Sequence, residues 1–526
     1  MRPFPEAPYA NGQPAARRSM PRVLRPRFTW RYVLCALVVF YALYCFVSSA
    51  PLFAQPLPSY SGPHPVGAID IEVPAASPRL VDTARFKDTK EDAFALQTVL
   101  FTLYYPAAGK ASRKPRHDWI PRPVSVTAEG YAKFAHINNF FTNAVFSGAI
   151  RALVGGIQIP ASVDVPLAET TDSSSTTAAS EFPFDGEETE KVLAADNDSI
   201  PVVVFSHGMA SSRTDYTHYA GELASRGYIV AMLEHRDGSC PGSIVMQDAA
   251  PEQARLTFRM SEVEHADGSA FEVDDFKRAQ LNYREAEIEE TVRVLKMVNA
   301  GHGGDIFKQN SRREGSDLEA WAGRLNTDEM IVAGHSYGAT GALQALKGGP
   351  TEKRPFKGGI ILDPGKQSGR LNDEINVPVL IVHSNSWSKS HSVFYGRPHF
   401  EVVRGLVEAN NARGNPSWFV TSLGTSHPSV TDAPLLEPML LSVTTGAKID
   451  VYEALRQYVH VSEDFLEYLQ DGVKRNLLAE KPEFPQYDNG HGFGTWKPGQ
   501  GAEEKGSGPW WDWRKYWQVH TSPNRT

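Results

Sequence analysis

The apolar positions of the chain are grouped into short runs, which are separated by longer stretches of mixed polarity. Each run has the length and the β-branched or aromatic content of a buried strand. The runs lie at residues 97–106, 201–205, 228–233, 330–333, 358–362, 377–382 and 418–423. Between and after them, residues 278–300 and 451–469 repeat apolar side chains every three or four positions, as amphipathic helices do. This alternation predicts a largely parallel sheet with helices on both faces.

The N-terminal part of the chain has a different pattern. Residues 1–31 hold seven arginines and one acidic residue, which predicts a disordered basic tail. Residues 32–54 form an apolar segment of 23 residues, long enough for a transmembrane helix. The arginines on its N-terminal side predict a signal anchor, with a cytosolic N-terminus and the rest of the chain in the lumen or outside the cell. Residues 55–66 follow as a proline-rich linker.

Two alternatives compete with the signal anchor. A signal peptide cleaved after Ala54 would give a secreted protein, but the basic region is longer than such peptides usually carry. A buried core helix is disfavoured because the arginines lie directly beside the apolar segment.

Charge and cysteine content exclude several classes of protein. The 526 residues carry a net charge of −8 and are 41% hydrophobic, so we expect a substantial core and no nucleic-acid partner. Of the three cysteines, Cys35 and Cys45 lie in the apolar N-terminal segment and Cys240 stands alone. The predicted domain therefore has neither an internal disulfide nor a cysteine metal site.

We predict one domain over residues 67–475. Within it, residues 168–199 are rich in serine and threonine and then in acidic residues, which predicts a disordered surface insertion. After it, residues 476–526 contain five tryptophans. This tail packs on the domain, lies at a membrane interface or has no role, and the sequence does not rank the three.

The stretch MIVAGHSYGATG at residues 330–341 carries the clearest chemistry. A strand, the motif Gly-x-Ser-x-Gly and a helix in succession are the nucleophile elbow of the α/β-hydrolases. The glycines permit a turn so sharp that the Ser336 hydroxyl is raised clear of the sheet. The Tyr337 N–H then lies at a helix N-terminus, where it can stabilise an oxyanion.

A serine nucleophile needs a base and an orienting acid, in the chain order Ser, acid, His. His427 is the best base, since it follows the last predicted strand; His383 and His391 are rivals, and His383 continues a strand. Asp363 is the best acid because it directly follows an apolar strand. The remaining candidates are less suitable: Asp373 and Glu374 precede a strand, and Asp432 comes after the base.

The second oxyanion donor should come from the loop after an early strand. Residues 206–209 (SHGM) occupy that place, so we assign the Met209 N–H. His207 and the residues 235–237 (HRD) also suggest a metal site, but they lack the spacing of ligands on one helix face. We expect them to be buried hydrogen-bonding groups that brace the loops. No cofactor is predicted.

Several stretches resemble the plasma and intracellular type II platelet-activating factor acetylhydrolases. They are residues 201–209 (PVVVFSHGM), 211–214 (SSRT), 223–237 (LASRGYIVAMLEHRD) and 334–338 (GHSYG), together with the strand end Leu362-Asp363. The resemblance extends over roughly residues 62–470, with interruptions. It implies an α/β-hydrolase fold and a calcium-independent serine esterase that removes short or oxidised sn-2 acyl groups from phospholipids. It also implies Ser336, Asp363 and His427 as the triad, with the amides of Met209 and Tyr337 as oxyanion donors.

Asp363 is followed by Pro-Gly-Lys instead of an aromatic run, which leaves the substrate less well defined than the triad. Two other hypotheses therefore stay open: an α/β-hydrolase that acts on another small ester, and a catalytically silent hydrolase-like protein tethered to a membrane. Residues 131–156 are apolar and aromatic with helical spacing. They pack in the core, or they line an acyl pocket or form a lid that faces a membrane.

Overall fold

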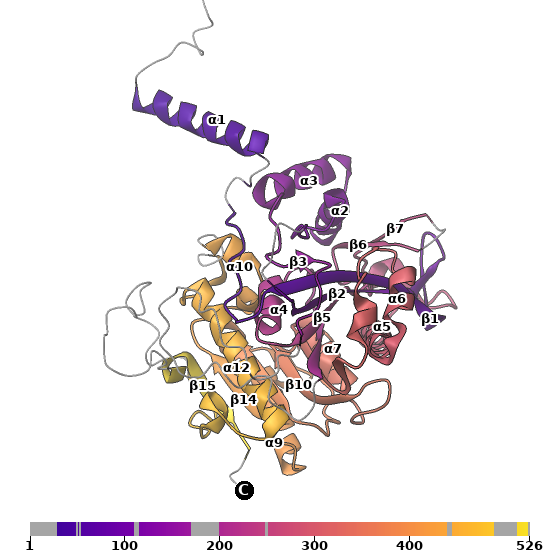
Figure 1. The fold of residues 1–526 in the computed structure, drawn as a ribbon, viewed down its shortest axis with the longest axis vertical. Helices are drawn as coiled ribbons and strands as arrows, with labels where there is room; N and C mark the ends of the chain where they lie inside the picture. Colours follow the sequence, from indigo (N-terminus) through magenta and orange to yellow (C-terminus); the bar gives the residue numbers. More distant parts are fainter. Residues whose placement is uncertain are drawn as a thin grey trace, which may run out of the picture.

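The computed structural model describes residues 29–48, 51, 54–109, 115–169, 199–247, 251–438, 444–488 and 513–523. Most of the predicted basic tail, almost all of the acidic insertion and the middle of the C-terminal tail lie outside these residues. Within them, one large mixed sheet carries helices on both faces (Figure 1).

The main sheet has the strand order β15-β14-β11-β10-β9-β4-β5-β2-β1-β3, and β8 pairs with β1. The block from β5 to β14 is parallel, whereas β2 and β15 are antiparallel to their neighbours. The hairpins β6–β7 and β12–β13 are separate. The strands are β1 (Val66–Phe86), β2 (Asp92–Pro106), β3 (Ser162–Val163), β4 (Ile200–Ser206), β5 (Ile229–Leu233), β6 (Gly242–Val245), β7 (Gln253–Leu256), β8 (Val263–Glu264), β9 (Leu325–His335), β10 (Phe356–Leu362), β11 (Val379–Ser384), β12 (Val393–Phe394), β13 (Arg397–Pro398), β14 (Trp418–Ser422) and β15 (Trp517–Thr521).

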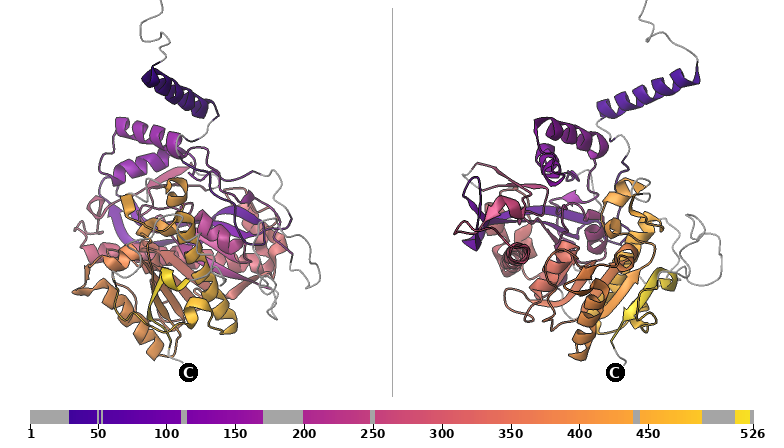
Figure 2. Two further views of the ribbon diagram at one scale, coloured as in Figure 1. Left: turned by 90° about the vertical axis from the view of Figure 1, so that its left-hand side faces the viewer. Right: turned by 180° about the vertical axis from the view of Figure 1, so that it is seen from behind.

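The helices cover the two faces of this sheet separately. α5, α7 and α9 contribute to the hydrophobic core on one face, and α4 and α12 to the core on the other (Figure 2). The helices are α1 (Trp30–Ser48), α2 (Val124–Phe134), α3 (Phe140–Val154), α4 (Thr217–Ala224), α5 (Val273–Met297), α6 (Gly303–Gln309), α7 (Tyr337–Ala345), α8 (Asn385–Lys389), α9 (His399–Ala412), α10 (Ala433–Leu436) and α12 (Val451–Asp471).

The parallel strands are apolar throughout because each of their faces is buried. In β4, Val202 and Val204 belong to one core, while Val203 and Phe205 belong to the other. Side chains alternate across a strand, so a strand between two helical layers needs apolar residues at every position. The predicted α/β architecture is confirmed, and the sheet with its strand-turn-helix at β9 and α7 is α/β-hydrolase-like.

The N-terminal helix differs from its prediction. Among the described residues, no helix combines the length and the apolar character that crossing a membrane requires. The transmembrane helix predicted over residues 32–54 is therefore not supported; within the described residues, α1 spans Trp30–Ser48. The location of the rest of the chain across a membrane stays a prediction.

The apolar stretch at residues 131–156 forms the end of α2 and the whole of α3. Both helices, like α1, lie outside the sheet and its two helical layers (Figures 1 and 2). No residue of α3 is buried, and Phe140 and Phe141 are 82% and 79% exposed. Core packing by α3 is therefore limited to its C-terminal half, where the partly buried Ile150 and Val154 pack against the core.

The C-terminal tail returns to the domain. Residues 517–521 form β15, which pairs antiparallel with β14 at the edge of the main sheet. Trp517 is buried and its indole N–H donates to Gln457 Oε1 on α12 at 2.9 Å. This part of the predicted tail packs on the domain, whereas Trp496, Trp510 and Trp511 lie outside the described residues.

Candidate active site

A sharp turn between β9 and α7 holds the predicted nucleophile. β9 ends at His335 and α7 begins at Tyr337, so Ser336 alone makes the turn. Its backbone has φ 57° and ψ −119°, values that a residue with a side chain rarely adopts. This is the strained geometry that a nucleophile elbow requires to raise a hydroxyl above the end of a sheet.

The two glycines of the motif allow this turn because no side chain fits at either position. A Cβ on Gly334 would lie 2.3 Å from the Gly338 carbonyl oxygen. A Cβ on Gly338 would lie 1.9 Å from the Ser206 carbonyl oxygen. Both obstructing atoms belong to backbone, so neither can give way by a change of rotamer.

The base and the acid predicted for Ser336 lie beside it in hydrogen-bonded order. His427 follows β14, and its Nε2 is 3.0 Å from the Ser336 Oγ. Asp363 follows β10, and its Oδ2 is 2.8 Å from the His427 Nδ1. In this arrangement, the imidazole can take the serine proton at one nitrogen while the carboxylate holds the other.

Asp363 is fixed by more than the histidine. Its Oδ1 accepts the Ser384 backbone N–H at 2.5 Å, and its Oδ2 accepts the Ser384 hydroxyl at 2.6 Å. The carboxyl side chain is 3% exposed, and its backbone φ is 49°. Hydrogen bonds to both oxygens fix the orientation of the carboxyl group toward His427.

The imidazole of His427 is held from the side by Trp387. The two rings stack with their centroids 4.0 Å apart and their planes 10° apart. The Trp387 indole N–H donates to the Pro364 carbonyl oxygen at 3.0 Å, while the His427 backbone N–H donates to the Ser386 hydroxyl oxygen at 2.9 Å. Trp387 could not be predicted from the sequence, because a lone tryptophan three residues beyond the end of β11 carries no motif.

The two amides assigned to the oxyanion hole lie on the segments that meet at Ser336. Tyr337 is the first residue of α7, and Met209 lies in the loop after β4. A Cβ on Gly208 would be 3.2 Å from the Ser336 Cβ, so this loop runs directly beside the nucleophile. Within the described chain, neither the Met209 N–H nor the Tyr337 N–H has a protein acceptor. Both groups are therefore available to a substrate oxygen.

The rival residues are placed elsewhere. His383 is buried on β11, where its Nδ1 lies 3.1 Å from the Ser388 hydroxyl, and His391 is exposed. Asp373 and Glu374 are exposed before β11. Asp432 accepts hydrogen bonds from Trp119, Thr217 and His218 at the start of α4. None of these side chains is hydrogen-bonded to His427 or Ser336 in the described structure.

The loop residues suspected of metal binding have other partners. His207, Glu234 and Cys240 place one potential ligand atom each within 4.8 Å of one another. However, His207 Nδ1 lies 2.8 Å from the Gly208 carbonyl oxygen, and its Nε2 accepts the His235 N–H at 3.0 Å. Both ring nitrogens are thus used within the protein, as expected for a bracing residue.

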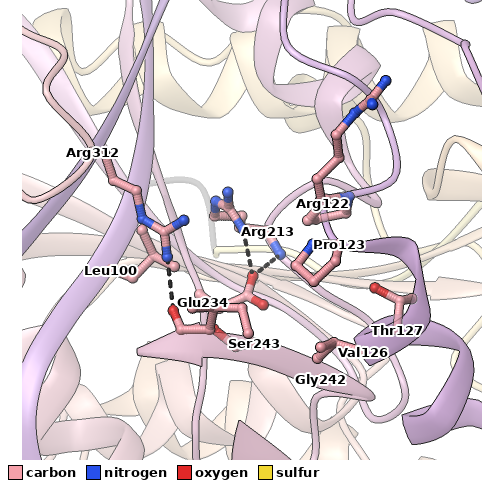
Figure 3. Close-up of a pocket in the computed structure, with 12 residues that line it drawn as sticks. Leu100, Arg122, Pro123, Val126, Thr127, Arg213, Glu234, Gly242, Ser243 and Arg312 are labelled. Atoms are coloured by element: carbon pink, nitrogen blue, oxygen red, sulfur yellow. Dashed lines mark hydrogen bonds and ion pairs between the residues drawn. The ribbon is translucent and has the colours of Figure 1, made fainter. Parts of the chain in front are cut away.

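A small cavity, lined by residues of α2 and by Glu234 just after β5, has no triad residue among its described lining residues (Figure 3). Arg122, Arg213 and Arg312 are among its lining residues. Each of the three is already paired with carboxylates: Arg122 with Asp118, Arg213 with Asp70 and Glu234, and Arg312 with Glu72. The cavity therefore offers no uncompensated arginine among its described lining residues.

The chain is similar to several known proteins. Residues 176–488 match the family model described as platelet-activating factor acetylhydrolase, isoform II. A Schizosaccharomyces pombe protein named "Putative phospholipase A2" is 26% identical over 448 residues, 78% of this chain and 91% of that protein. The platelet-activating factor acetylhydrolase of Cavia porcellus is 25% identical over 67% of this chain and 68% of its own. A solved ferulic acid esterase from Streptomyces cinnamoneus has a TM-score of 0.46 at 18% identity, over 82% of this chain and 97% of that one.

Proposed function

The chain belongs to the platelet-activating factor acetylhydrolase isoform II family and is thus an ester hydrolase; from this premise we propose that it cleaves the short or oxidised sn-2 acyl ester of phospholipids such as platelet-activating factor. The observation that carries the proposal is the hydrogen-bonded order of Ser336, His427 and Asp363. The choice of substrate is supported by the family and by the names of the two relatives described above.

In the proposed first step, the Ser336 Oγ attacks the ester carbonyl carbon while His427 Nε2 takes the hydroxyl proton. The carbonyl oxygen becomes negatively charged and accepts hydrogen bonds from the Met209 and Tyr337 N–H groups. Asp363 keeps the imidazole proton on Nδ1 and stabilises the positive charge that forms on the ring. The stacked Trp387 face adds a cation–π contact to that charge.

Collapse of the tetrahedral intermediate then breaks the bond between the carbonyl carbon and the lysophospholipid oxygen. His427 passes its proton to that oxygen, which leaves as an alcohol, and the acyl group stays on Ser336. A water molecule repeats the attack, with His427 again as the base, and releases the carboxylic acid. The cycle consumes one water and regenerates the hydroxyl.

The exposed face of α3 fits a substrate that is presented in a lipid aggregate. Phe140, Phe141 and Val145 are 82%, 79% and 67% exposed on a helix outside the two helical layers. Of the three interpretations of residues 131–156, this supports the membrane-facing lid, which an apolar exposed helix can form at a lipid surface.

The test is a chain-length series with the full-length protein. Phosphatidylcholines that differ only in the sn-2 acyl group, from acetyl to palmitoyl, are hydrolysed in parallel with short p-nitrophenyl esters, and Ser336→Ala is the control. We expect rapid turnover of the acetyl substrate and a steep fall with chain length. Equal rates across the series, or cleavage of p-nitrophenyl esters alone, would point to another ester. Absence of any activity would support the catalytically silent alternative.

A further inference from the structure

Behind the candidate nucleophile lies a cluster of buried polar side chains that the triad does not use. Its centre is Arg284 on α5, whose side chain is 0% exposed. Beside it, Ser206 Oγ is 2.7 Å from His235 Nε2, and His235 Nδ1 is 2.6 Å from Glu287 Oε2. These three residues are arranged like a catalytic triad, but all are buried, so no substrate reaches Ser206. Buried charge of this kind is costly unless it is fully paired, and here it surrounds the turn at Ser336.

Arg284 holds the loop that follows β4. Its Nη1 donates to the His207 carbonyl oxygen at 2.7 Å and to the Ser206 Oγ at 3.1 Å. Its Nε donates to Asp237 Oδ2 at 2.8 Å, and its Nη2 donates to the Ser239 Oγ at 2.6 Å. The planar guanidinium therefore ties the loop after β4 to the loop after β5 with directed hydrogen bonds, a geometry that a lysine cannot reproduce.

The same guanidinium also contacts the first residue of α7. The Arg284 guanidinium carbon lies 4.5 Å from the centroid of the Tyr337 ring. The Tyr337 hydroxyl donates to the Gln280 Oε1 at 2.7 Å, one turn earlier on α5. Through these contacts, α5 fixes the start of α7 and the loop after β4 relative to each other. These are the two segments that carry the Met209 and Tyr337 amides.

His207 links these contacts to the Met209 amide. Because its Nε2 accepts the His235 N–H, the neutral ring carries its proton on Nδ1 and donates it to the Gly208 carbonyl oxygen. Burial and the charge of Arg284 lower the pKa of His207 to about 4, which keeps the ring neutral. The Gly208 C=O and the Met209 N–H belong to one planar peptide group, so holding the first aims the second.

We propose that Arg284 and His207 are positioning residues that fix the Met209 and Tyr337 N–H groups relative to each other before the substrate arrives. This rests on the ester-hydrolase mechanism proposed above. Donors that meet the negative charge only as it develops lower the barrier of the chemical step, and they add little to binding of the ester itself. Loosening either residue should therefore lower kcat and leave KM nearly unchanged.

The experiment compares Arg284→Lys and His207→Leu with the wild type in the full-length protein, with p-nitrophenyl acetate as substrate. Arg284→Lys keeps a positive charge for Asp237, and His207→Leu leaves the Arg284 side-chain contacts in place. Turnover is normalised to the Ser336 sites titrated to completion by a fluorophosphonate, so that misfolded protein does not count. We expect kcat to fall roughly 10²-fold in each variant, the loss seen when one oxyanion donor is removed, with KM little changed.

The matched control is Arg236→Lys. Arg236 is another buried arginine, paired with Glu72 and Thr98, and its side chain contacts neither residues 206–209 nor Tyr337. Its replacement should lower stability but leave kcat per titrated site near the wild-type value. If this control loses kcat as Arg284→Lys does, the effect is one of general stability and the proposal is wrong.

A second readout separates positioning from a structural defect. The Ser336 Oγ adds to the carbonyl carbon of a trifluoromethyl ketone, and the resulting oxyanion lies at the Met209 and Tyr337 N–H groups. The affinity of the ketone should therefore fall in parallel with kcat/KM in both variants. Unchanged kcat and unchanged ketone affinity in Arg284→Lys, with an active wild type, would overturn the positioning role alone. An inactive wild type would overturn the proposed function together with it.

Discussion

Replacing Asp363 by asparagine probes the acid through the histidine tautomer. The carboxylate accepts the Ser384 N–H on Oδ1, and it accepts the Ser384 hydroxyl and the His427 Nδ1–H on Oδ2. An asparagine has the same shape but only one acceptor oxygen. If that oxygen faces the Ser384 N–H, the amide NH₂ faces His427 Nδ1, which must then accept. The imidazole proton moves to Nε2, and the ring can no longer take the proton of Ser336.

The opposite orientation of the amide does not rescue the site, because it sets the NH₂ group against the Ser384 N–H, donor against donor. We therefore expect the wrong tautomer to dominate in Asp363→Asn. In the serine triad used as the general template, the same change costs about 10⁴ in kcat. At about 1.4 kcal/mol for each factor of ten, this corresponds to roughly 5.5 kcal/mol of the activation barrier.

The assay is kcat on p-nitrophenyl acetate and on a 2-acetyl phospholipid, with the fold checked by circular dichroism. Ser336→Ala and His427→Ala should fall as far as Asp363→Asn, and double variants should add little because the three act as a unit. Asp373→Asn and Glu374→Gln are exposed carboxyl controls and should stay near wild type. If Asp363→Asn keeps most of its turnover while one control loses it, the acid lies elsewhere and the assignment is refuted.

Three further predictions follow from the same geometry. Gly338→Ala should give no folded, active protein, because the new Cβ would lie 1.9 Å from the Ser206 carbonyl oxygen. Gly341→Ala is the control and should fold, because its Cβ would have no atom closer than 3.5 Å. Equal soluble yields of the two variants would contradict this. Turnover should be unchanged in excess chelator, since the proposed steps use only hydroxyl, imidazole and amides; a loss that calcium or zinc restores would refute the mechanism. The urea concentration at half-unfolding should fall as the pH is lowered from 7.5 to 5. Histidines in the unfolded chain bind protons near pH 6.5, whereas the buried histidines of the folded chain stay neutral, so protons stabilise the unfolded state. A midpoint that does not change with pH would contradict this. Burial lowers the pKa of His207, His235, His335, His383, His399 and His520. Fewer carboxyls have a raised pKa and oppose the trend: Asp215, Asp432, Asp464 and Glu287.

The parallel part of the sheet was predictable because a strand buried on both faces leaves a continuous apolar run in the sequence. β1 was not predicted, since its later half is polar and exposed and carries no such run. β15 was missed for a different reason. Its pairing with β14 joins residues almost a hundred positions apart, for example Ser422 and Trp517, and no local pattern encodes a partner at that distance.

The candidate triad residues could be predicted from the sequence because each follows an apolar strand: Ser336 and Asp363 directly, and His427 five residues after Ser422. The difference between His427 and its rival His383 also follows from strand ends. His383 still pairs with Thr421 inside the sheet, whereas His427 comes five residues after Ser422, beyond the last paired position. A side chain within the ladder is held in the sheet, whereas one past its end can reach across the ends of β11 and β10 toward Ser336.

The groups that surround the triad follow no such rule. Arg284 lies in the middle of an amphipathic helix, where a charged residue ordinarily marks the solvent-facing side, yet it is among the most deeply buried side chains described. Its burial is stable only because Asp237, Ser206 and the His207 carbonyl supply acceptors from two different loops. His207 and residues 235–237 were predicted to brace the loops, but Arg284 as their common partner was not predicted. The cluster exists only when α5, the loop after β4 and the loop after β5 meet. The proposed positioning of the oxyanion donors by Arg284 and His207 therefore depends on the assembled fold. The candidate triad, in contrast, could be predicted from the positions of strand ends alone.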